Sequence, residues 1–138
     1  ILITLFVVVL VIALAGHARA AESQVLKAGD VIRMKVTAYC PCGICCGPNA
    51  KGITSKGDDA WVCDGVAVAP TLIPYRTRLQ IPGIRDIKEA DDTGGAMRQD
   101  AKHGIYHIDL RFRTHKEAKK WGVQWLDVKV ISVPQGKR

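Results

Sequence analysis

Three aspartates are the side chains of this sequence best suited to acid–base chemistry. Asp91 and Asp92 are adjacent and precede a glycine-rich segment, and Asp109 lies in a segment where apolar and polar residues alternate. Side chains of neighbouring residues in an extended chain point to opposite faces, so only one of Asp91 and Asp92 can enter a given cleft. If Asp92 and Asp109 share a cleft, their like charges raise the pKa of one carboxyl, and partial burial raises it further. A carboxyl that holds its proton near neutral pH can deliver it to a glycosidic oxygen.

Each aspartate also has a simpler interpretation. Asp-Thr-Gly-Gly is an ordinary turn in which the aspartate accepts backbone N–H bonds. Asp109, flanked by His and Arg, can belong to a solvated ion-pair face. If the cleft exists, the backbone of the glycine-rich segment and the polar faces of two strands would bind the substrate. These expected binding residues are Thr93, Gly94, Gly95, Tyr39, Thr37, His107 and Arg111.

Cysteines form a second group with possible chemistry. They are Cys40, Cys42, Cys45, Cys46 and Cys63, and the first four fit the pattern C-x-C-x-x-C-C. In an exported protein the default is two disulfides with one thiol left over, in a pairing that the sequence leaves open. A zinc–thiolate site made from these same five residues is the alternative. A third possibility, a cysteine nucleophile assisted by His103 or His107, lacks a third group to orient the histidine. We expect no cofactor and, by default, no metal.

Alternation of apolar and polar residues predicts the elements that must position these groups. Thr114 followed by Glu117 is a capping box, so a helix is expected from there to Gly122, with Ala118 and Trp121 facing inward. Residues 40–60 are expected to be a loop and residues 91–95 a turn. Many short strands and one helix favour a small β-barrel over a βαβ sheet. Strands are expected over 32–39, 65–69, 78–81, 84–90, 106–112 and 125–133.

The beginning of the chain resembles an export signal. Residues 1–16 carry no charge, and Ala18 and Ala20 give the A-x-A pattern that a signal peptidase reads. Sixteen apolar residues are fewer than the ~20 needed to span a bilayer, which favours cleavage and transient membrane contact over an uncleaved anchor. We therefore expect a signal at 1–20, a lead-in at 21–33, a barrel domain at 34–133 and a basic tail at 134–138.

Net charge points to the same compartment. The chain has 20 Lys and Arg against 13 Asp and Glu, a formal charge of +7. A basic exported protein suits anionic surfaces such as cell-wall polymers. Nucleic acid is not an expected partner, because export separates the protein from it and the basic residues are scattered. The expected location is the periplasm, the cell wall or the extracellular space.

Five motifs, in this order, resemble the three-aspartate (3D) domain family over roughly residues 34–133. The resemblance implies a six-stranded double-psi β-barrel with one short helix, similar to the catalytic barrel of membrane-bound lytic transglycosylase A, which cleaves peptidoglycan. The motifs are VTAY at 36–39, GVAVAP at 65–70 with IP at 73–74, DTGGAM at 92–97, IDLRF at 108–112, and THKEA at 114–118 with WG at 121–122.

The resemblance also implies roles for the aspartates. The family's second and third aspartates fall on Asp92 and Asp109, whereas its first is replaced by Ala69 and a turn glycine by Arg76. In the transglycosylase relatives, the aspartate that falls on Asp92 is the single acid/base. It protonates the oxygen between N-acetylmuramic acid and N-acetylglucosamine and then accepts the C6 hydroxyl proton, which closes a 1,6-anhydro ring. Asp109 would raise the pKa of Asp92 or stabilise the cationic transition state.

The leading expectation is an exported enzyme that cleaves peptidoglycan glycan strands. Two other functions stay open. One is a non-catalytic wall-binding module on the same barrel, which the replacement at Ala69 favours. The other is an interaction domain stapled by its cysteines.

Overall fold

The computed structural model describes residues 25–135, so the expected signal and the last residues of the expected tail lie outside the described residues. The elements are β1 (Val31–Tyr39), α2 (Gly43–Cys46), the 3-10 helix η1 (Ala60–Val62), β2 (Gly65–Val68), β3 (Arg78–Gln80), β4 (Lys88–Thr93), α3 (Gly95–Ala101), β5 (His107–Arg111), α4 (His115–Trp121) and β6 (Gln124–Ser132). The prediction of a mainly β protein is confirmed. Within residues 25–135, no helix has the length and apolar character needed to cross a bilayer.

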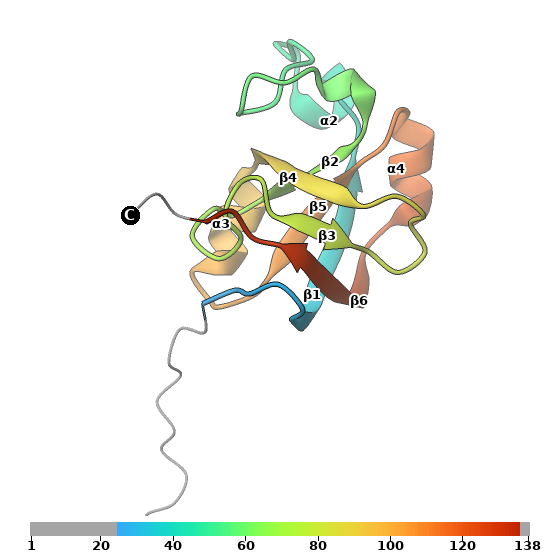
Figure 1. The fold of residues 1–138 in the computed structure, drawn as a ribbon. Helices are drawn as coiled ribbons and strands as arrows, with labels where there is room; N and C mark the ends of the chain where they lie inside the picture. The colour runs from blue at the N-terminus through green and yellow to red at the C-terminus, as the bar shows by residue number, and fades with distance from the viewer. Residues whose placement is uncertain (1–24, 136–138) are drawn as a thin grey trace, which may run out of the picture.

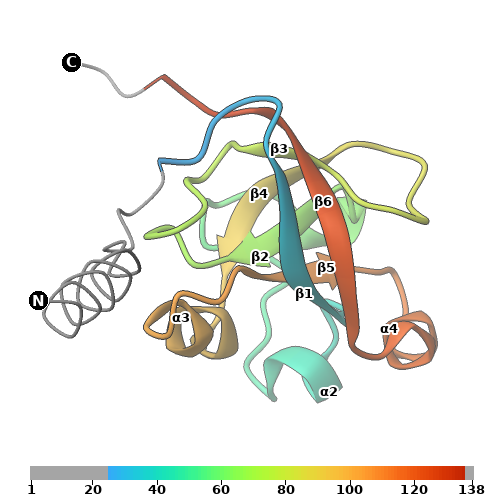
Figure 2. The same cartoon turned by 90° about the horizontal axis from the view of Figure 1, so that it is seen from below.

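The six strands form one sheet whose hydrogen bonding closes into a ring (Figure 1). The strand order is β1-β5-β2-β4-β3-β6, and β6 pairs again with β1. The pairs β1–β5 and β2–β4 are parallel, and the other four are antiparallel. Figure 2 shows α2 between α3 and α4 along one side of the sheet. The parallel pairs join segments that are far apart in the sequence, which is how Tyr39 comes to lie beside Arg111.

Alternation along β1 and β5 separates the core from a polar row. Met34 and Val36 of β1 and Ile108 of β5 are fully buried, and the exposed fraction of Leu110 of β5 is 1%. Burial of such side chains is worth about 25 cal/mol per Å² of apolar surface. The pattern therefore fixes which face of each strand points into the core, and the residues between point the other way.

Helix α4 begins and ends where the sequence predicted. The Thr114 hydroxyl accepts from the Glu117 backbone N–H at 3.2 Å, and the Glu117 carboxylate accepts from the Thr114 N–H at 3.0 Å, which completes the capping box. Trp121 packs against the Phe112 ring and donates its indole N–H to the Val36 carbonyl at 3.3 Å. These contacts hold α4 beside β1.

The prediction of one helix and of a turn at 91–95 was wrong. Strand β4 continues through Asp91 and Asp92 to Thr93, and the residues after Gly94 form α3 rather than a polar loop. The pairing of β2 with β4 shifts between Ala90 and Asp92, so Asp91 is the extra residue of a bulge. A seven-residue helix anchored by the buried Met97 is too short for a helical period to reveal it.

At position 76 the resemblance predicts a glycine, and Arg76 adopts a backbone conformation that glycine favours. Arg76 has a φ of 68°, in the left-handed region that costs a side-chain-bearing residue about 1–2 kcal/mol. Its guanidinium lies 2.7 Å from Glu89 and 3.1 Å from Asp58. The backbone that leads into β3 therefore has the conformation of a glycine turn even though residue 76 is an arginine.

Gly65, the first residue of β2, packs closely against the buried ion pair of Asp91 and Arg111. A Cβ added at this position would overlap the Asp91 carboxylate and the Arg111 guanidinium. We expect Gly65→Ala to lower the free energy of unfolding by about 1–3 kcal/mol, the usual cost of overpacking. Urea unfolding measures this, with Gly95→Ala as the control, because its added Cβ meets nothing within 4 Å. Equal stability of the two variants would contradict this packing.

Candidate active site

A pocket of about 390 Å³ lies between the sheet and the loop at 40–60. Residues between 41 and 53 form its outer wall, and Gly94 and Met97 close it near α3. The sheet side contributes both predicted carboxylates, Asp92 and Asp109. A volume of this size is typical of small-molecule sites.

Strand β2 brings the two carboxylates to the same pocket. Ala67 pairs with Asp92 of β4 on one side and with Asp109 of β5 on the other. Two strand spacings of about 4.8 Å put the α-carbons of the aspartates roughly 10 Å apart. The small side chain of Ala67 lies between them and also lines the pocket. The space for a reacting group between the carboxyls thus depends on a small residue at 67.

Asp92 is held by three donors from three parts of the chain. Its Oδ2 accepts the Tyr39 hydroxyl at 2.8 Å, and its Oδ1 accepts the Ser55 N–H at 2.9 Å and the Thr93 N–H at 2.8 Å. Burial is the main reason that the pKa of Tyr39 is raised, so the phenol keeps the proton it donates. The Ser55 bond ties the loop at 40–60 directly to this carboxylate.

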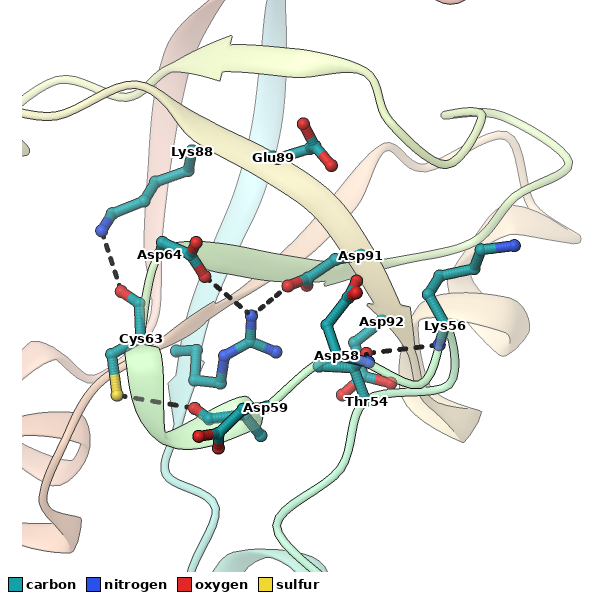
Figure 3. Close-up of polar contacts among 12 residues, drawn as sticks. Thr54, Lys56, Asp58, Asp59, Cys63, Asp64, Lys88, Glu89, Asp91 and Asp92 are labelled. Atoms are coloured by element: carbon teal, nitrogen blue, oxygen red, sulfur yellow. Dashed lines mark hydrogen bonds and ion pairs between the residues drawn. The ribbon is translucent and has the colours of Figure 1, made fainter.

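Arg111 supports Tyr39 from behind the pocket. Its Nη1 donates to the Tyr39 hydroxyl at 3.1 Å, and its Nη2 donates to Asp91. Figure 3 shows Asp64 and Asp91 turned toward the same guanidinium, which lies 3.7 Å from Asp64. Burial opposes the charged guanidinium, but the bonds to Asp91 and Tyr39 outweigh it and raise the pKa of Arg111. The structure therefore separates the adjacent aspartates as expected: Asp92 faces the pocket and Asp91 pairs with a buried arginine.

Asp109 ends a chain of polar contacts that leads away from the pocket. Its Oδ1 lies 2.7 Å from the Thr37 hydroxyl, which lies 2.8 Å from Nε2 of His107. Nδ1 of His107 lies 2.8 Å from Asp100, and Asp100 accepts from Lys35 at 2.9 Å. The parallel register pairs Thr37 with Asp109 and Lys35 with His107, so the contacts follow from the pairing of β1 with β5.

Protonation of Asp109 is linked to the state of His107, because the Thr37 hydroxyl has one hydrogen. If Asp109 is ionised, Thr37 donates to it, and Nε2 of His107 must carry a hydrogen. If Asp109 is protonated, it can donate to Thr37, which then donates to Nε2. Burial raises the pKa of Asp109, and Asp92 raises it further, against the bond from Thr37. Burial and Lys35 lower the pKa of His107. The shift at Asp109 favours its neutral form more than in an exposed aspartate, and the shift at His107 favours the neutral imidazole.

Of the seven predicted binding residues, three line the pocket and four do not. Tyr39, Thr93 and Gly94 line the pocket. Gly95 begins α3 outside the lining. The other three, Thr37, His107 and Arg111, lie behind the pocket.

The interpretation of β5 as a solvated ion-pair face was wrong. His107 and Arg111 are 4% and 1% exposed. Both lie against other polar side chains, Asp100 for His107 and Asp91 for Arg111. Alternation marks which residues face away from the core, and it does not say whether water or protein covers that face.

Three contributors to the site were not predicted. Ser55 acts through its backbone, which leaves no trace in the sequence. Ala67 and Asp100 could be placed only once the strand pairing and α3 were known.

No family model and no curated protein matches this sequence.

The raised pKa of Asp109 has a consequence for stability that can be measured. Because the folded pKa lies above the usual 3.8, the fold opposes ionisation, and the protein loses stability as pH rises from 3.8 through the folded value. Asn at this position does not ionise. We expect Asp109→Asn to gain stability over the wild type as pH rises through this window, measured by urea unfolding. The control is Asp127→Asn, whose side chain is 63% exposed. An advantage for Asp109→Asn that shrinks with rising pH would refute the raised pKa.

Proposed function

We propose that this protein is an exported, lytic transglycosylase-like enzyme that cleaves the glycan strands of peptidoglycan. The observation that carries the proposal is the convergence of Asp92 and Asp109 on one pocket from opposite sides of β2. Two carboxyls that flank one space, in unlike environments, are the usual arrangement in enzymes that cleave glycosidic bonds.

The environments favour Asp109 as the proton donor, in place of Asp92. Burial raises the pKa of Asp109, and its contact with Thr37 is compatible with a protonated carboxyl. Asp92 accepts hydrogen bonds from three donors, and such bonds stabilise an ionised carboxylate. We therefore give Asp109 the acid/base role and Asp92 the role of stabilising positive charge at the sugar ring.

Under this proposal the reaction needs no water. Asp109 gives its proton to the glycosidic oxygen as the bond from that oxygen to C1 of N-acetylmuramic acid breaks. Asp92 stabilises the cationic character that develops at C1. The C6 hydroxyl attacks C1 and returns its proton to Asp109, which restores the acid. One proton carrier and an oriented intramolecular nucleophile suffice for the cycle.

Features around the carboxyls suit an anionic saccharide. Lys51 lines the pocket from the loop side and supplies a cation for the lactyl or peptide carboxylates of the substrate. Tyr39 presents a ring beside Asp92. The net charge of +7 favours approach to an anionic wall.

We also propose that the ring is the double-psi β-barrel of the three-aspartate family. Its two parallel pairs, β1–β5 and β2–β4, support this assignment. Ala69, which stands where the family has its first aspartate, is buried beside Ala67 and Met97 and does not line the pocket. The replacement therefore leaves both pocket carboxyls in place.

Digestion of purified peptidoglycan tests the proposal. We expect the wild type to release 1,6-anhydro products, detected by mass spectrometry. Asp109→Asn and Asp92→Asn should each lower the rate by about 10²-fold or more, the usual worth of a positioned proton donor or charge stabiliser. Asp127→Asn, with its exposed carboxyl, should match the wild type.

Absence of anhydro products from the folded wild type would exclude the enzymatic role. In that case, co-sedimentation of the protein with sacculi separates the remaining alternatives. Binding that survives Asp92→Asn would identify a wall-binding module, and no binding would leave the interaction domain.

A further inference from the structure

Three of the five cysteines and one histidine converge beside the pocket. Sγ of Cys40 lies 2.7 Å from Sγ of Cys42 and 3.4 Å from Sγ of Cys45, and Sγ of Cys45 lies 3.3 Å from Nδ1 of His115. All four ligand atoms lie within 4.8 Å of one another. The five cysteines are free thiols in the structure, so no S–S bond competes for these atoms.

Two of these three distances are close to those of a tetrahedral metal site. With Zn–S bonds of about 2.3 Å and Zn–N bonds of about 2.0–2.1 Å, ligand atoms at tetrahedral angles lie roughly 3.8 Å apart for S and S, and 3.6 Å for S and N. The contacts of Cys45 with Cys40 and His115 are within a few tenths of an ångström of these values. Binding would widen the contact between Cys40 and Cys42 by about 1 Å.

We infer that Cys40, Cys42, Cys45 and His115 form a structural zinc site. Three thiolates and an imidazole are a set that zinc accepts in closed, four-coordinate sites, and soft sulfur ligands disfavour magnesium and calcium. This inference does not depend on the proposed reaction. It differs from the five-cysteine site considered from the sequence, because a histidine 70 residues from Cys45 replaces Cys46 and Cys63.

The thiols of the other two cysteines, Cys46 and Cys63, bond to backbone carbonyls and not to the cluster. The Cys46 thiol donates to the Cys40 carbonyl at 3.3 Å, and the Cys63 thiol donates to the Trp61 carbonyl at 3.3 Å. Neither belongs to the cluster of four ligand atoms. Cys46 is adjacent to a proposed ligand, which makes it the closest control that the chain offers.

The site would fasten one wall of the pocket to the body of the protein. Three ligands come from the segment that leaves β1 and enters α2, and the fourth is the first residue of α4. That segment and the loop after it form the outer wall of the pocket, and the loop reaches Asp92 through Ser55. A metal at this point would restrict the wall where it leaves the sheet.

Metal analysis of the full chain tests the inference. After incubation with zinc and removal of the excess, the wild type should retain one equivalent, measured by inductively coupled plasma mass spectrometry. Cys45→Ser and His115→Ala should weaken zinc binding more than about 100-fold, since even loss of an outer partner costs 10–100-fold. Cys46→Ser and the exposed His103→Ala should retain the metal. His115→Cys should also retain it, because sulfur replaces nitrogen as the fourth ligand.

Cobalt provides a second measurement that does not depend on activity. Cobalt in the wild type should show thiolate charge-transfer absorption and the intense visible bands of tetrahedral coordination, and both should disappear in His115→Ala and return in His115→Cys. The inference is overturned by a folded, reduced wild type that retains no zinc. Equal zinc retention by Cys45→Ser, equal loss in Cys46→Ser, or a Cys40–Cys42 disulfide that persists with zinc present would also overturn it.

Discussion

The parallel register of β1 and β5 is the constraint on which the rest of the structure depends. It places Thr37 beside Asp109 and Tyr39 beside Arg111, while the alternate residues of both strands fill the core. A slip of one residue would exchange the buried apolar set for the polar row, at a cost of several kcal/mol per strand. The same apolar burial that stabilises the ring therefore fixes the positions of the groups around the pocket.

Residues that this register aligns form two hydrogen-bond networks, one at each pocket carboxyl. Asp92 is held by Tyr39, which Arg111 supports from behind. Asp109 meets Thr37, whose single hydrogen links it to His107. Strand β2 separates the two carboxyls by one small residue. Asp92 thus accepts three hydrogen bonds, whereas Asp109 is half-buried and its pKa is raised mainly by desolvation. Acid–base chemistry uses such a difference between two carboxyls.

Local signals in the sequence were enough for the elements with strong patterns. The alternation in β1 and β5 and the capping box of α4 predicted those elements nearly to the residue. Helix α3 was missed, because seven residues with one buried side chain carry no helical period. Asp92 and Asp109 line one pocket, as the hypothesis of a shared cleft predicted. The burial of His107 and Arg111 was not predicted. His115 was not predicted as a neighbour of the cysteines, because only the tertiary fold joins segments 70 residues apart.

Partial burial and the neighbouring charge of Asp92 raise the pKa of Asp109 above its usual 3.8. Titration of the side-chain carboxyl carbon of Asp109 by nuclear magnetic resonance, in the wild type and in Asp92→Asn, measures this directly. The account predicts a midpoint above 3.8 in the wild type and a lower midpoint once the charge at position 92 is removed. A midpoint at or below 3.8, or one that does not respond to Asp92→Asn, would contradict it.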